Sequence, residues 1–271
     1  MKKQINNVIA VAAIALTATL TQSAYATTIA DDYWGASGGS EVIGSTSVFG
    51  ITSMDVIRVG DTLKVSINTN FAGKGDDGYF SGTGGLGPDL TNGLGIGYGD
   101  LFLSNVWNPF GTGPEYKTDD HSNGTIWTYG FSLADRYMDE GTGTGTLFSL
   151  DGATNDANAK LSNDFISSGT STYRNGQEVA VDVDSVDASG KPNTSLVANN
   201  NSSWSVNSST VNFEIDLTGT SLLYSDTIAL HWGMTCANDT IEGIANEPEP
   251  AIFGLLALGL TGIGVSKRKN S

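Results

Sequence analysis

The chain has 271 residues, with 29 Asp or Glu against 13 Lys or Arg, so its formal net charge is −16. Such an acidic chain should repel nucleic acids and anionic lipids, which excludes both as expected partners, and it should attract divalent cations. Its 35 glycines favour turns and loops, and its single cysteine, Cys236, allows no disulfide within the chain. We interpret Cys236 as a small buried residue, with an intermolecular disulfide or a metal ligand as the alternatives.

The first 26 residues have the order of a secretory signal peptide. Two lysines follow the initiating methionine, residues 8–20 form an uncharged and mostly apolar run, and Ala24 and Ala26 are the small residues that a signal peptidase requires. The apolar run of 13 residues is shorter than the roughly 20 that a membrane-spanning helix needs. We therefore expect signal peptidase to cut after Ala26, so that the mature chain starts at Thr27.

The following segments alternate apolar and polar residues with the period of two that half-buried strands show. The clearest of them, residues 62–68, follows a Gly-Asp turn and predicts a hairpin with the segment before it. The expected strands are residues 56–59, 62–68, 100–103, 125–131, 178–183, 204–206, 211–217 and 227–232. A single short helix is expected near residues 156–166, where apolar residues recur every fourth position.

These strands and the Gly-, Ser- and Asn-rich loops between them predict one all-β domain over residues 27–246. We expect an antiparallel β-sandwich of jelly-roll character, whose strand topology the sequence leaves open. This body carries 8 Lys or Arg against 27 Asp or Glu, a net charge of −19. Its acids are mostly Asp, which favours turns, whereas Glu favours helix interiors.

Motifs that would indicate catalysis are present only in part. Residues 73–78 and 82–87 match G-x-G-x-x-G, but no expected helix follows them, so we interpret both as loops. Residues 35–39 match G-x-S-x-G, but a nucleophile elbow also needs a strand before it, a helix after it and a downstream acid and histidine, and this match lies in a polar segment close to the expected mature start. His121 lies in a turn-like, Asp-containing run, where it is solvated or binds a metal, and His231 is interpreted as a core residue. We therefore expect no enzyme.

A calcium site is a candidate near the end of the expected strand at residues 178–183. Asp182, Asp184 and Asp187 place carboxylate oxygens two and three residues apart, as a bent calcium-binding loop can. The EF-hand pattern fails here, because its glycine and its final glutamate are misplaced. The alternative is a solvated acidic strand end, and no other cofactor is expected.

The last 25 residues differ in composition from the body. Residues 247–250 contain two prolines, residues 251–265 are uncharged and mostly apolar, and three basic residues follow. As a helix, the apolar run covers only about 22 Å at about 1.5 Å per residue, against a bilayer core of roughly 30 Å. Basic residues stay on the cytoplasmic side of a membrane. The tail therefore predicts a helix that inserts into the membrane and leaves the body outside it.

This tail resembles the PEP-CTERM sorting signal of Gram-negative bacteria. The resemblance covers about the last 25 residues: a Pro-Glu-Pro motif, a helix rich in Leu, Gly and Ala, and a basic end. The polar Thr261 in the helix and the two residues after the basic end depart from the pattern. The matching residues of the motif and of the basic end are Pro248, Glu249, Pro250, Lys267, Arg268 and Lys269.

The resemblance implies two partners beyond signal peptidase. One is a membrane-embedded exosortase that cuts near the motif, and the other is exopolysaccharide, whose production often accompanies this family. Residues 235–239, T-C-A-N-D, also look like the endings of other PEP-CTERM bodies, which implies a shared β domain of unassigned activity. We therefore expect an exported cell-surface or extracellular-matrix protein that is processed by exosortase, associated with biofilm and not catalytic.

Two alternatives remain open. The first is a carbohydrate-binding module, perhaps assisted by calcium, in which aromatic side chains stack on sugar rings. Its candidate residues are Trp107, Trp127 and Trp204, which are otherwise core or sheet-face residues. The second is a glycan-active enzyme, which needs two carboxylates facing each other across a cleft.

Overall fold

A computed structural model describes residues 25–32, 42–75, 87–89, 94–110, 119–166, 173–198 and 200–246 of the chain. Residues 25–247 form one compact unit. Several expectations lie outside the described residues: the signal peptide up to Ala24, the Pro-Glu-Pro motif, the apolar tail helix and its basic end. Within the described ranges, no helix has the length and apolar character that crossing a membrane requires.

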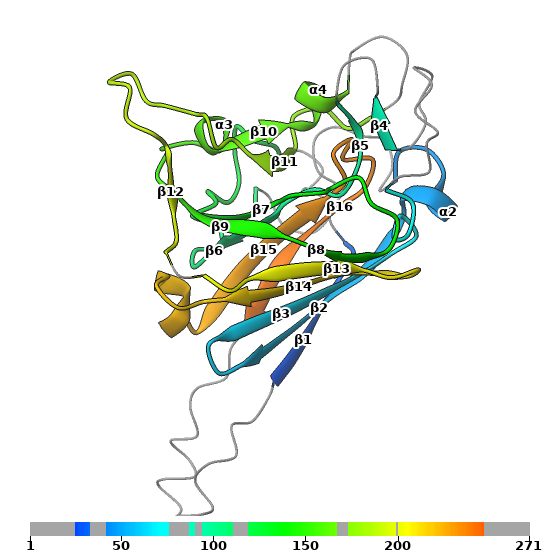
Figure 1. Cartoon of the computed structure of the whole chain (residues 1–271), viewed down its shortest axis with the longest axis horizontal. Helices are drawn as coiled ribbons and strands as arrows, with labels where there is room; N and C mark the ends of the chain where they lie inside the picture. Colours follow the sequence, from blue (N-terminus) through cyan, green and yellow to red (C-terminus); the bar gives the residue numbers. More distant parts are fainter. Residues whose placement is uncertain are drawn as a thin grey trace, which may run out of the picture. The chain divides into compact units, whose positions relative to one another are not determined.

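The unit is mostly β, with two antiparallel sheets of six strands each. Sheet 1 comprises β1 (Tyr25–Ala30), β2 (Ile51–Val59), β3 (Thr62–Thr69), β8 (Gly141–Gly143), β13 (Ser203–Val206) and β14 (Thr210–Asp216). Sheet 2 comprises β6 (Leu101–Ser104), β7 (Tyr129–Leu133), β9 (Gly145–Leu150), β12 (Thr194–Leu196), β15 (Thr227–Gly233) and β16 (Thr240–Asn246). Their strand orders are β1-β2-β3-β14-β13-β8 and β12-β9-β7-β6-β15-β16 (Figure 1).

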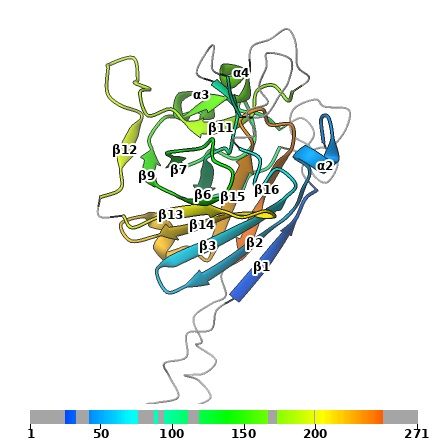
Figure 2. The ribbon, with the colours of Figure 1, turned by 45° about the vertical axis from the view of Figure 1, so that its right-hand side comes forward.

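Smaller elements complete the unit. Two short antiparallel pairs join β4 (Gly87–Asp89) to β5 (Leu94–Ile96) and β10 (Ala159–Leu161) to β11 (Glu178–Val181). Single helical turns are α2 (Thr46–Phe49), α3 (Asn155–Asn158), α4 (Ser162–Phe165) and the 3₁₀ turn η2 (Ser221–Tyr224). We call residues 155–166 and 173–181 the cover, because they lie on the side of sheet 2 that faces away from sheet 1 (Figures 1 and 2).

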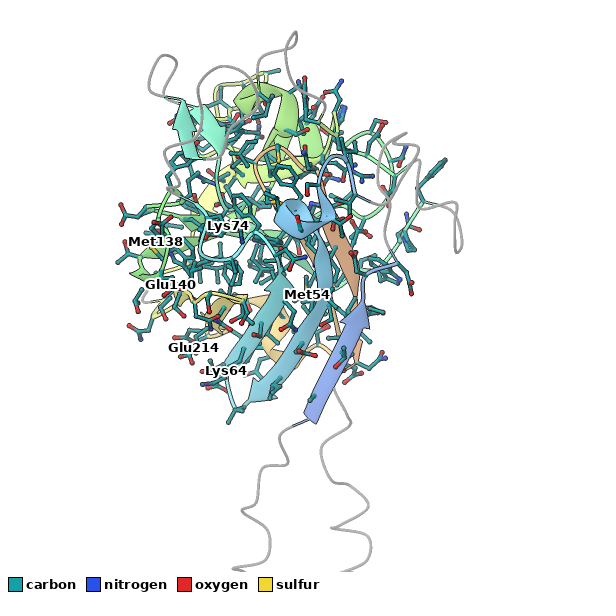
Figure 3. The ribbon with its side chains drawn as sticks, turned by 90° about the vertical axis from the view of Figure 1, so that its right-hand side faces the viewer. Met54, Lys64, Lys74, Met138, Glu140 and Glu214 are labelled. Carbon is teal, nitrogen blue, oxygen red and sulfur yellow. The ribbon has the colours of Figure 1, made fainter. Side chains whose placement is uncertain are left out.

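The two sheets share one hydrophobic core. Along β3, Leu63, Val65 and Ile67 are buried, whereas Lys64 points outward and pairs with Glu214 of β14 at 2.7 Å (Figure 3). This is the alternation expected of a strand with one face on the core. Across the core, the ring of Phe131 in sheet 2 meets the ring of Phe213 in sheet 1 edge-on, with 6.2 Å between their centroids. The second sheet thus supplies the partner surface that the first sheet needs.

Most of the expected strands are present, but two expectations need correction. The hairpin of β2 and β3 turns at residues 60–61, where Gly60 has the positive φ that glycine tolerates. β7 begins at Tyr129, four residues later than expected. The single helix expected near residues 156–166 is wrong, because β10 separates α3 from α4 and pairs with β11.

Candidate functional site

The face of sheet 2 that points away from the shared core carries a row of six residues, one on each strand. Each is paired directly with the next, and the row from β12 to β16 is Leu196, Phe148, Gly130, Phe102, His231 and Glu242. Residues directly opposite each other in a sheet project from the same face. The row therefore places an aromatic, apolar end beside β12 and an ionisable end beside β16.

The cover packs on the middle of this row and forms a second, smaller hydrophobic cluster. Gly130 makes room for Val181 of β11, since a Cβ at position 130 would lie 2.4 Å from Cγ2 of Val181. The buried members of the cluster are Phe102, Trp127, Leu150, Ala159, Val181 and Ala229. Leu196 and Phe148 lie at the other end of the row, where Leu196 is exposed and Phe148 is partly buried.

The ionisable end of the row is centred on His231, which is 0% exposed. Its Nε2 lies 2.9 Å from the carbonyl oxygen of Glu178, and its Nδ1 lies 3.1 Å from Oε2 of Glu242. A carbonyl oxygen only accepts hydrogen bonds, so Nε2 must carry a proton. A second proton must then lie between Nδ1 and Glu242, either on the ring or on the carboxyl. His231 and Glu242 therefore share one proton across this contact.

Three buried carboxyls surround this histidine. Burial raises the pKa of Glu178 to about 8, and burial together with the nearby charge of Glu242 raises that of Asp119 to about 8. Burial also raises the pKa of Glu242, whose Oε1 has no hydrogen-bond partner among the described residues. Because the ionised form of a buried carboxyl is disfavoured in this environment, these three carboxyls favour their protonated forms near neutral pH.

The cluster is closed to solvent. Asp119 and Glu178 are buried like His231, and Glu242 is 9% exposed. The ring of Trp127 lies 5.5 Å from the ring of His231, centroid to centroid, and shields it further. In this conformation a dissolved substrate reaches none of the four groups. What the three buried carboxyls can do chemically is to bind and release protons as the pH changes.

The structure does not bring the three candidate sugar-stacking tryptophans together. Trp204 is 1% exposed, lies in the main core and donates from Nε1 to the carbonyl oxygen of Thr144 at 3.0 Å. Trp127 is 2% exposed and belongs to the second cluster, against which the partly buried Trp107 also packs. A buried ring face cannot stack on a sugar, so in this conformation Trp127 and Trp204 act as core residues.

The three candidate calcium ligands follow β11. Asp182 lies 3.9 Å from Nζ of Lys160, and Asp184 is exposed. The carboxylate of Asp187 accepts hydrogen bonds from the hydroxyl and amide of Ser189 and from the amide of Lys191, and these bonds lower its pKa. The described residues contain no group of three or more His, Cys, Asp or Glu side chains arranged to hold a metal ion. Calcium at this bend stays a prediction.

The two other residues singled out for metal or thiol chemistry have local roles. His121 is partly buried, and its Nδ1 lies 3.0 Å from Oδ1 of Asp156 in α3. Cys236 is fully buried, as expected, and burial raises the pKa of its thiol to about 12. A thiol with so high a pKa contributes almost no thiolate at neutral pH, so Cys236 is a poor nucleophile and metal ligand.

The T-C-A-N-D segment, residues 235–239, forms the buried turn between β15 and β16. The hydroxyl of Thr235 accepts from the amide of Gly97 at 2.9 Å, and Oδ2 of Asp239 accepts from the amide of Ile51 at 2.7 Å. The carbonyl oxygen of Ala237 accepts from Nε of Arg174 at 3.1 Å. Each bond ties the turn to a different segment, so the polar residues of this motif have a structural role.

The two ends of the described body lie next to each other. The hydroxyl of Thr27 in β1 is 3.5 Å from the carbonyl oxygen of Asn246, the last residue of β16. Ala26, the expected cleavage residue, is exposed on β1 and pairs with Ile57 of β2. The position expected to follow the signal peptide and the position that precedes the sorting motif are therefore neighbours.

The sequence pointed to His231 but to none of its partners. Glu178 and Glu242 lie on β11 and β16, and only the pairing of distant strands brings them to β15. β16 itself was not expected, because Glu242 and Gly243 interrupt the apolar pattern at its centre. The one local signal is the short turn at residues 234–239, across which a hairpin would pair residue 231 with residue 242.

No family model matches this chain, and neither a curated protein nor a solved structure matches it. The functional conclusion therefore depends on the sequence and on the geometry described above.

Proposed function

We propose that this chain is an exported cell-surface or extracellular-matrix protein whose two ends are removed, the first by signal peptidase and the second by exosortase. The C-terminal helix would hold it at the inner membrane until exosortase acts near Pro248–Pro250. The released body would then be a non-catalytic component of an exopolysaccharide-containing matrix. We also infer that its two sheets form a β-sandwich of jelly-roll character, because the chain passes repeatedly from one sheet to the other.

One observation supports this proposal above the others: both expected cuts fall at the edges of the folded body. A cut after Ala26 removes only the first two residues of β1, and Ile29 is the first described core residue. At the other end, Ala245 is the last residue of the core and β16 ends at Asn246. Pro248 follows two residues later, so neither cut removes a described core residue.

A role without catalysis is supported by the state of the two histidines. Both ring nitrogens of His231 face partners within a closed cluster, and His121 faces Asp156. General acid–base catalysis requires such a group within hydrogen-bond reach of a substrate. The buried carboxyls around His231 are likewise closed to solvent, which does not favour the alternative of a glycan-active enzyme.

Intact-mass analysis of protein recovered from producing cells tests the proposal. The expected species starts at Thr27 and lacks the residues that follow Pro250. The matched control replaces the motif through Pro248→Ala, Glu249→Ala and Pro250→Ala, and this variant should keep its tail while still losing the signal peptide. A wild-type mass that retains residues 251–271 would contradict processing by exosortase.

A further inference from the structure

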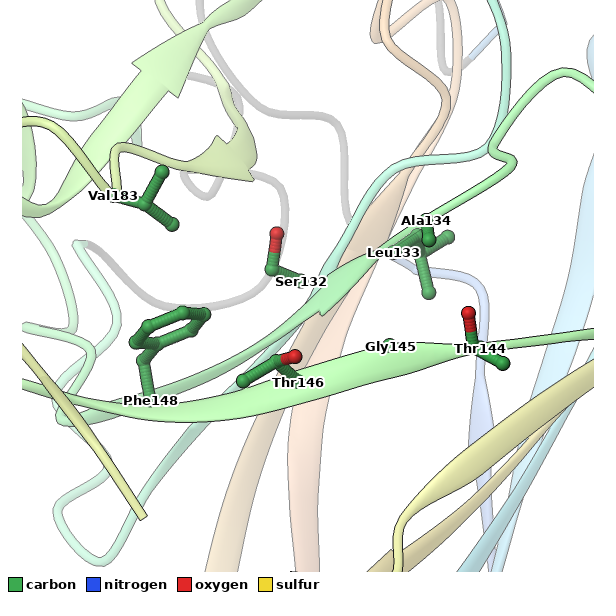
Figure 4. Close-up of a pocket in the computed structure, with 8 residues that line it drawn as sticks. All are labelled: Ser132, Leu133, Ala134, Thr144, Gly145, Thr146, Phe148 and Val183. Atoms are coloured by element: carbon green, nitrogen blue, oxygen red, sulfur yellow. The ribbon is translucent and has the colours of Figure 1, made fainter. Parts of the chain in front are cut away.

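A groove of about 360 Å³ lies on the outer face of sheet 2, at the aromatic end of the row (Figure 4). Ser132 of β7 and Thr146 of β9 form its floor together with Phe148. Val183, which follows β11, lies opposite Phe148 and closes one side. This volume falls in the range of about 300–1,000 Å³ that small-molecule sites occupy.

The floor offers hydroxyl groups beside an aromatic ring. Ser132 and Thr146 are directly paired across β7 and β9, and Phe148 is two residues further along β9, so all three side chains project from the same face. Neither hydroxyl forms a hydrogen bond with any residue that the structure describes, so both are available to a ligand. Phe148 is only partly buried and retains an accessible surface.

The wall of the groove is held in place by the cover. Val183 is 43% exposed, and the residues around it are bonded to α3. The amide of Asp182 donates to the carbonyl oxygen of Asn158 at 2.9 Å, and the hydroxyl of Ser185 donates to that of Ala157 at 2.7 Å. The floor belongs to paired strands. A ligand would therefore enter a site that is largely formed in advance, which reduces the entropy cost of binding.

Charge restricts the class of ligand. None of the side chains that line the groove is ionisable. A cation would find no carboxylate there, and the net charge of −19 on the body would repel an anion. The combination of an aromatic ring, an aliphatic side chain and free hydroxyls suits a neutral molecule with C–H faces and many hydroxyl groups of its own.

We propose that this groove binds one or two sugar units of a neutral polysaccharide, with Phe148 and Val183 against the sugar's C–H faces and Ser132 and Thr146 bonded to its hydroxyls. This inference deepens the proposed matrix function, and it moves the expected sugar contact from the buried tryptophans to Phe148. The two proposals fail separately, because the groove is tested by binding and the processing by mass.

Affinity electrophoresis tests the groove, using protein recovered from expressing cells in a detergent without a sugar headgroup. Native gels contain dextran, laminarin, galactomannan or the neutral exopolysaccharide of the producing cells, and alginate serves as the anionic comparison. We expect at least one neutral polymer to retard the protein. Phe148→Ala should weaken that retardation about tenfold, the effect of about 1.4 kcal/mol in binding free energy.

Two further variants separate binding from folding. Ser132→Ala with Thr146→Val keeps the size of the side chains and removes both hydroxyls, so it should weaken binding without changing the circular dichroism spectrum. Tyr224→Ala removes an aromatic ring that is 88% exposed on η2, outside the groove, and should bind as the wild type does.

Three results would overturn the inference. These are retardation by no neutral polymer, retardation by alginate alone, and equal retardation of the wild type, Phe148→Ala and the double variant. A dimer in polymer-free buffer that Phe148→Ala abolishes would also overturn it, because the groove would then belong to a contact between two copies of the chain.

Discussion

At the residue scale, the carboxyls around His231 show how strongly burial controls protonation in this protein. The row on sheet 2 places His231 against Glu242, the cover adds Glu178, and the segment before Trp127 adds Asp119. An ionised carboxyl in such an environment loses its hydration without full compensation. The folded protein therefore holds these carboxyls in the protonated form more strongly than the unfolded chain does, and this difference must appear in its stability.

We predict that the free energy of unfolding falls as the pH rises from 5 to 8. A carboxyl whose pKa is raised by folding contributes stability that is complete below its unfolded pKa and is lost as the pH rises through its folded pKa. For Glu178 this window runs from its ordinary value of 4.5 to about 8. Glu178→Gln should flatten the dependence by up to about 1.4 kcal/mol per pH unit, as measured by urea denaturation.

The general acidity of the body requires a control, since lowering the pH also relieves repulsion among its exposed carboxylates. Asp184→Asn likewise replaces one carboxyl by an amide, but at an exposed position. It should raise stability slightly at every pH and keep the wild-type slope. If Glu178→Gln, Asp184→Asn and the wild type show the same slope, the buried carboxyls do not titrate as described.

At the element scale, strands with regular alternation could be predicted from the sequence and irregular ones could not. β3, β14 and β15 carry apolar residues at every second position or in an unbroken run, so local pattern and final burial agree. β8 is a Gly-Thr segment with no apolar signal, yet it forms a strand because Trp204 of β13 packs over Gly143. Such a strand depends on its partner rather than on its own residues.

The local sequence pattern could not predict the groove or the ionisable row, for the same reason. Both arise from the register of strands that are far apart in the chain, such as Phe148 of β9 opposite Leu196 of β12. A shift of one residue in any pairing would turn these side chains into the core. The aromatics chosen from the sequence were tryptophans, and the fold buries two of the three, Trp127 and Trp204, in its cores.

The contact between the cover and sheet 2 gives a prediction about two elements together. Gly130→Ala should destabilise the protein by about 1–3 kcal/mol, because its Cβ would overlap Val181 of β11. Val181→Ala removes the methyl groups that clash and should cost about 1–3 kcal/mol in the wild-type background, since it leaves a cavity. In the Gly130→Ala background, Val181→Ala should lower the free energy of unfolding by clearly less than it does in the wild type. Urea denaturation of the four proteins measures this coupling.

Strict additivity of the two substitutions would contradict the packing described here, because residues in contact usually show interaction energies of about 0.5–3 kcal/mol. A useful comparison is Gly190→Ala paired with Val181→Ala. Gly190 lies in the loop after β11 with a positive φ, and a Cβ added there would meet open space, so its substitution strains the backbone without touching Val181. These two substitutions should be additive.

At the scale of the whole molecule, the central property is that all core residues in the described part of the chain lie between Ile29 and Ala245, inside the two ends that we propose are removed. The net charge of −19 is spread over a two-sheet body whose core is built by residues 29–245. Such a charge opposes self-association. Thr27 and Asn246 lie side by side, so the two proposed cuts would fall close to each other in space.

This placement of the core predicts how the body responds to truncation of β1. A body that starts at Thr27 loses only the pairs of Tyr25 and Ala26 with β2, and its melting temperature should match that of a body starting at Tyr25 within about 2 °C, because terminal residues at a sheet edge contribute little. A body that starts at Asp31 also loses Ile29, whose side chain packs against the backbone of Gly243 in β16. Losing a buried isoleucine lowers the free energy of unfolding by about 1.5–3 kcal/mol, which corresponds to a decrease in melting temperature of about 3–12 °C in a domain of this size.

Ile29→Ala in the body that starts at Thr27 should reproduce most of that decrease while leaving β1 paired with β2. Differential scanning calorimetry of the four proteins measures these differences. If the body that starts at Asp31 melted with the others, β1 would not belong to the folded unit, and the coincidence between the signal-peptide cut and the edge of the fold would be lost.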